Sequence, residues 1–151
     1  MKNKRYLKIE LIWKDDDMIE LQVSSNNGRY SGMTEVYDTR ESLLEFASSL
    51  KEYPSKPDII KYETGQQDSS FGYFGMKCYP IGELGIIGVQ ITLENKAATA
   101  YRLEEKDKLT MELIVEPNAI DVFQREWLEL IKKEDREAEL VGIPRHASFV
   151  K

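Results

Sequence analysis

The chain has 151 residues, with 21 Lys and Arg against 27 Asp and Glu, and a formal net charge of -6. This charge disfavours long-range attraction to nucleic acid phosphates and to anionic membranes, so we expect neither as a partner. The single cysteine, Cys78, excludes an internal disulfide, and the single histidine, His146, leaves few groups for acid, base or nucleophilic catalysis.

The length predicts a single domain over residues 1–151, with a core within 6–135. The tail over 142–151 is expected to be either a docked strip or flexible. Residues 1–6 are basic but lead directly into an alternating strand, so no secretory signal is indicated. The longest uncharged apolar stretch, 84–93, is about half the length of a membrane helix. We therefore expect a cytoplasmic protein.

Three strands are predicted first, over residues 7–13, 18–24 and 29–37, because apolar and polar residues alternate in them. Turn-forming residues separate them, Asp15 to Asp17 in the first gap and Asn26 to Gly28 in the second. The alternation places Trp13 on the same inward face as Leu7. Gly32 indicates a bulge or a point where another backbone approaches closely.

A helix is predicted over Thr39–Leu50, because its apolar residues recur at helical spacing. Asp38 with Glu41 resembles a capping box, and Thr39 is the alternative N-cap. Strands follow over 59–63, 71–79, 85–93, 97–103 and 109–116. A second helix begins after Asn118 and runs to about Glu134, with Trp127 on its apolar face.

Runs of consecutive strands with short turns are typical of the α+β class. We expect an antiparallel sheet of about seven to eight strands with two helices packed on it, in the order βββ-α-βββββ-α. Trp13 and Trp127 are both expected to anchor the core.

The chain offers few groups of the kind that build a catalytic or metal site. Asp15, Asp16 and Asp17 could ligate Ca²⁺, but the spaced ligands of a calcium loop do not follow, so a solvated hairpin tip is favoured. Cys78 alternates with apolar residues and is expected to be buried and inert. His146, in the tail, is interpreted as an incidental surface residue. We expect no metal, no cofactor and no enzymatic activity.

The segment Gly65–Gly75 is a candidate ligand-binding loop, because polar residues precede several aromatic ones. Its candidate contacts are Gln66, Asp68, Phe71 and Tyr73. The alternative interpretation is that these aromatic residues belong to the core.

The chain resembles uncharacterised families of small bacterial α+β proteins, some of which are similar to immunity proteins of contact-dependent toxins, of the WapI type. The resemblance rests on Gly32, Thr34 and Tyr37, on the Phe46-Ala47 pair, and on the run Glu116–Phe123 that opens the last helix. It implies a cytoplasmic protein that blocks a toxin domain by tight binding and performs no chemistry.

Three functions follow from these observations. We favour a non-catalytic binding protein, whose acidic turn at Asp15 to Asp17 and exposed sheet edge bind a basic toxin domain. A small-ligand module using residues 65–79 is the alternative. An enzyme built on scattered carboxylates ranks last; these carboxylates are Glu10, Glu20, Glu63 and Glu112. A homodimer is a further alternative, because exposed edge strands can pair with those of a second copy.

Overall fold

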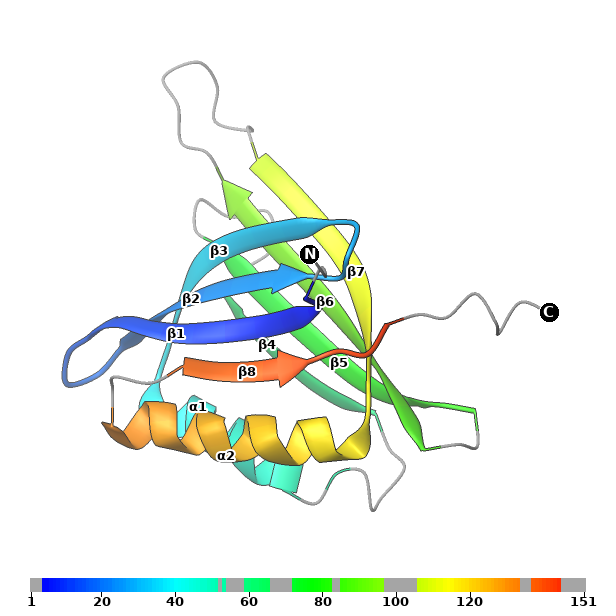
Figure 1. Cartoon of the computed structure of the whole chain (residues 1–151). Helices are drawn as coiled ribbons and strands as arrows, with labels where there is room; N and C mark the ends of the chain where they lie inside the picture. Colours follow the sequence, from blue (N-terminus) through cyan, green and yellow to red (C-terminus); the bar gives the residue numbers. More distant parts are fainter. Residues whose placement is uncertain are drawn as a thin grey trace.

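The computed structural model describes residues 4–51, 53, 59–65, 72–82, 85–96, 106–133 and 137–144. Within these residues the chain forms two helices and eight strands (Figure 1). In chain order they are β1 (Tyr6–Lys14), β2 (Ile19–Asn26), β3 (Ser31–Asp38), α1 (Arg40–Lys51), β4 (Ile60–Gly65), β5 (Tyr73–Ile81), β6 (Ile86–Lys96), β7 (Lys106–Val115), α2 (Pro117–Lys133) and β8 (Glu137–Val141).

The strands form two antiparallel sheets of four, which confirms the α+β class and the number of strands. The first sheet has the order β3-β2-β1-β8 and the second the order β4-β5-β6-β7. The eighth strand, β8, follows α2, whereas we had expected no strand after the second helix. The strand that we had expected over 97–103 lies outside the described residues. β8 was missed because only Ala138 and Leu140 alternate with polar residues in its five positions.

The edge of the first sheet formed by β8 is covered. β8 pairs with β1 on one side, and α2 runs alongside its other side (Figure 1). The backbone N–H of Glu139 donates to Glu126 Oε1 on α2 at 2.8 Å. This edge is therefore not open for pairing with a strand of a partner.

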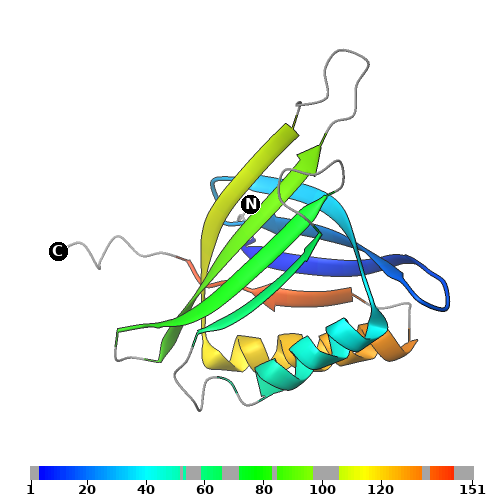
Figure 2. The same cartoon turned by 180° about the vertical axis from the view of Figure 1, so that it is seen from behind.

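The other edge strand, β3, lies against the second sheet, whose strands cross in front of it in Figure 2. The Thr34 hydroxyl donates to the Glu94 carbonyl at 2.8 Å, and the Thr64 hydroxyl donates to the Tyr37 carbonyl. A Cβ on Gly32 would lie 2.9 Å from Leu109 Cδ2. The neighbours of Gly32 are thus side chains, whereas we had expected a bulge or a close approach of another backbone.

The helices and the inner faces of both sheets share one core, centred on aromatic rings. Trp127 of α2 contacts Phe46 of α1 and Tyr62 of β4, with ring centroids 5.1 and 5.6 Å apart. Its Nε1 donates to the Leu43 carbonyl at 2.8 Å, and the residue is fully buried. The prediction that Trp127 anchors the core is confirmed.

Two further predictions are answered by local geometry. Thr39 is the N-cap of α1, since its Oγ1 accepts the Ser42 N–H at 3.1 Å, while Asp38 accepts hydrogen bonds from Ser42 and Tyr62. Cys78 is fully buried, and this burial raises the pKa of its thiol to about 12.

No helix of the described residues is long and apolar enough to cross a membrane.

Candidate protein-binding surface

The most unusual surface feature is Trp13, which is 46% exposed. The alternation of β1 predicted an inward side chain, and this prediction is wrong. The register between β1 and β2 shifts after Leu11: Leu11 pairs with Leu21, but Trp13 pairs with Glu20. Ile12 is therefore an extra residue in the strand, a β-bulge. Because side chains alternate faces, one inserted residue moves Trp13 from the inner face to the outer face.

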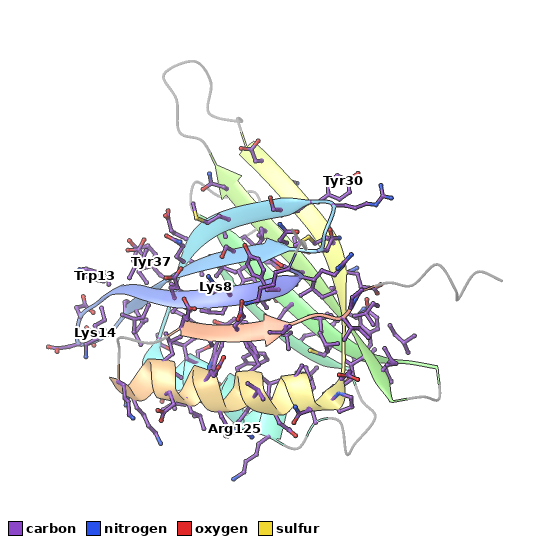
Figure 3. All side chains as sticks on the ribbon, viewed as in Figure 1. Lys8, Trp13, Lys14, Tyr30, Tyr37 and Arg125 are labelled. Atoms are coloured by element: carbon purple, nitrogen blue, oxygen red, sulfur yellow. The ribbon has the colours of Figure 1, made fainter. Side chains whose placement is uncertain are left out.

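Trp13 has an aromatic neighbour on the same outer face. In the register of the sheet, Trp13 pairs with Glu20, and Glu20 pairs with Tyr37 on β3. The rings of Trp13 and Tyr37 meet edge to face, with centroids 6.3 Å apart, and Tyr37 is 43% exposed. Figure 3 shows both side chains at the same end of the first sheet, with Tyr30 at the other end.

Carboxylates surround this aromatic pair. Glu20 lies between the two rings, and the next row of the sheet places Glu10 and Glu35 on either side of Gln22. Within the described part of the chain, none of these three carboxylates forms an ion pair. We call Trp13, Tyr37, Glu10, Glu20 and Glu35 together the aromatic–acidic face.

The cations nearby do not neutralise this face. Lys8 lies on the same side of the sheet, but its Nζ is 3.9 Å from Glu137 on β8. Lys14 pairs with Ile19, whose side chain is buried, so the register assigns Lys14 to the opposite side of β1. The aromatic–acidic face therefore keeps a negative potential around an exposed aromatic centre.

Partial desolvation and the carboxylates also affect Tyr37 itself. Desolvation raises the pKa of its phenol, and the charge of Glu20 and hydrogen bonding to it raise the pKa further. A tyrosine is neutral at pH 7 even without this shift, so the Tyr37 hydroxyl can donate and accept hydrogen bonds at a partner's surface.

The acidic turn, Asp15 to Asp17, follows Trp13 in the chain, and Asp15 forms its hydrogen bonds within the turn. Asp15 Oδ1 accepts the backbone N–H groups of Met18 at 2.7 Å and Asp17 at 2.8 Å, and these bonds lower the pKa of Asp15. Asp16 and Asp17 are exposed at the hairpin tip, three and four residues after Trp13. Within the described ranges, no three His, Cys, Asp or Glu side chains form a group that could hold a metal ion.

The other candidate residues lie outside the described residues or on the second sheet. Gln66, Asp68, Phe71 and His146 lie outside the described residues. Tyr73 lies on the second sheet, where its hydroxyl donates to Glu63 Oε1 at 2.8 Å. Phe74, the next aromatic residue of the candidate loop, is fully buried in the core. The structure thus separates Asp15 to Asp17 from Tyr73.

The four carboxylates that we considered as parts of an enzyme's active site lie on two different sheets. Glu10 and Glu20 lie on the first sheet, whereas Glu63 and Glu112 lie on the second. Glu112 accepts a hydrogen bond from the Tyr79 hydroxyl, as Glu63 does from Tyr73. They do not converge on one cleft.

Sequence reasoning missed Trp13 and Tyr37 as surface residues. The one available signal was Ile12, an apolar residue at a position where the alternation requires a polar one. Such a residue is compatible with a bulge, but also with a strand covered on both faces.

Comparison of the chain with protein-family models, with curated proteins and with solved structures gave no match. The resemblance to toxin-immunity proteins stays a prediction.

Proposed function

We propose that this chain is a binding protein that holds a basic protein partner against the aromatic–acidic face. The observation that carries the proposal is the exposed Trp13–Tyr37 pair surrounded by Glu10, Glu20 and Glu35. Trp and Tyr dominate the centres of protein interfaces, because each buries a large area with few rotatable bonds.

The charges of the face favour a particular partner. Three carboxylates without ion pairs in the described structure, on a chain of net charge -6, attract a basic surface and accelerate its encounter. A second copy of this chain would bring like charges together at the same face. A homodimer through this face is therefore disfavoured relative to a basic partner.

A toxin domain neutralised by direct binding is the specific case that we propose. An inhibitor of this kind needs a rigid contact surface and no catalytic group. Here the surface is built on paired strands, backed by the aromatic core. Adjacent hydrophobic side chains extend it, since Ile12 is 45% and Met33 52% exposed.

The proposal is tested with the protein encoded beside this chain. Co-expression with wild type should relieve any growth inhibition by that protein, and the purified pair should bind more weakly as salt rises. Trp13→Ala should weaken binding by about 30-fold, the loss expected for a central aromatic contact. Tyr30→Ala is the matched control, because Tyr30 is 61% exposed but lies at the other end of the sheet (Figure 3).

Equal affinities of the wild type, Trp13→Ala and Tyr30→Ala would exclude the aromatic–acidic face as the contact. Binding that does not respond to salt, or that is unchanged when Glu10, Glu20 and Glu35 are all replaced by Gln, would exclude the basic partner.

A further inference from the structure

The outer face of the second sheet carries a hollow that the proposed function does not use. Its volume is about 390 Å³, within the range of small-molecule sites, and it is open to solvent on one side. β4, β5 and β6 all contribute side chains to it, among them Lys61, Glu63, Lys77, Gln90 and Thr92.

The hollow exists because Gly75 has no side chain at its centre. Gly75 pairs with Glu63 on one side and with Thr92 on the other, so a larger residue would project between them. The ring of Tyr73 occupies part of this space: a Cβ on Gly75 would lie 2.6 Å from the Tyr73 hydroxyl. The remaining space is lined by polar groups from three strands.

Two lysines lie side by side in the lining of this hollow. Lys61 of β4 and Lys77 of β5 are paired directly in the sheet register. Like charges in directly opposite positions destabilise a sheet. Within the described residues, neither ammonium group forms an ion pair that would offset this cost. Glu63 contributes one negative charge to the same lining, so the described lining residues keep an excess of one positive charge.

The other groups are compatible with an anion. Glu63 is the single carboxylate among the described residues that line the hollow, and its Oε1 already accepts the Tyr73 hydroxyl at 2.8 Å. Gln90 pairs with Lys77 and can donate through its amide. The Thr92 hydroxyl lies 3.3 Å from that of Thr110, so it can accept from Thr110 and donate into the hollow.

We propose that this hollow binds a small molecule through its phosphate group, with Lys61 and Lys77 as the cationic contacts and Gln90 and Thr92 as neutral donors. A phosphate monoester carries a charge of about -1.5 to -2 at pH 7 and has three strong acceptor oxygens, so it can contact both ammonium groups at once. Donors that converge from three strands also suit the tetrahedral arrangement of phosphate oxygens better than a planar carboxylate.

Phosphate titrations followed by NMR test the proposal. Inorganic phosphate and phenyl phosphate are added separately to ¹⁵N-labelled protein at constant ionic strength, with succinate as the carboxylate probe. Phosphate and phenyl phosphate should shift the amides of β4, β5 and β6 around Lys77 and reach saturation. Lys77→Gln should raise the dissociation constant by about tenfold, because one charge-assisted contact is lost.

Lys132→Gln is the matched control, since it removes the same charge from an exposed position on α2. It should bind phosphate as the wild type does. Lys77→Gln should also fold, because it relieves the repulsion with Lys61, and its unchanged amide spectrum away from the hollow verifies this. Shifts that do not saturate, or equal dissociation constants for Lys77→Gln and Lys132→Gln, would overturn the site. Succinate binding as tightly as phosphate would overturn its assignment to phosphate.

Discussion

The two tryptophans of this chain should respond very differently to the same substitution, because one is buried and the other is displaced to the surface by a bulge. Trp127→Phe removes one ring of a fully buried side chain and its hydrogen bond to the Leu43 carbonyl. Trp13→Phe makes the same change in a side chain that is 46% exposed.

The cost of Trp127→Phe can be worked out from three contributions. Phe buries about 40 Å² less apolar surface than Trp, which is worth about 1 kcal/mol. The lost hydrogen bond is worth about 1 kcal/mol. A residual cavity of about 35 Å³ adds about 1 kcal/mol. The free energy of unfolding should therefore fall by about 3 kcal/mol, which lowers the Tm by about 6–12 °C for a chain of this size.

Trp13→Phe should change the free energy of unfolding by less than about 0.5 kcal/mol, as surface substitutions usually do. Urea denaturation followed by far-UV circular dichroism measures both variants without relying on tryptophan fluorescence. Fluorescence then gives an independent check: acrylamide should quench the Trp13 that remains in Trp127→Phe more strongly than the Trp127 that remains in Trp13→Phe. Equal stability losses in the two variants, or equal quenching, would refute the bulge at Ile12.

Two other predictions concern single contacts. Thr39→Ala should lower the free energy of unfolding by about 1 kcal/mol in urea denaturation, because the Ser42 N–H loses its acceptor, while Thr39→Ser should stay close to the wild type. An unaffected Thr39→Ala would indicate that Asp38 caps the helix instead. Burial, followed by the hydrogen bond to Glu63, raises the pKa of Tyr73 to about 12, from about 10 in an unfolded chain. Neutral Tyr73 therefore stabilises the fold below pH 10, and this contribution is lost between pH 10 and about 12. An NMR titration of labelled tyrosine measures this pKa, which should fall in Glu63→Gln; the same pKa in both proteins would contradict the contact.

Much of the local structure could be read from the sequence, because it depends on neighbouring residues. The spacing of Leu43, Phe46 and Leu50 predicted a helix over 39–50, and α1 spans Arg40–Lys51. Turn residues at Asp15 to Asp17 and Asn26 to Gly28 correctly separated β1, β2 and β3. The burial of Cys78 and Trp127 followed from the same periodicities.

The sequence by itself determined the helices, most of the strands and the negative charge of this protein, since periodicity, turn chemistry and composition are properties of the chain alone. Only the tertiary structure decided that the strands divide into two sheets, that β8 returns beside β1, and that Lys61 lies opposite Lys77. It also decided the exposure of Trp13. A bulge is defined by the strand that pairs with it, so the face on which Trp13 lies is set by its pairing with Glu20 on β2 and not by its place in the alternation of β1.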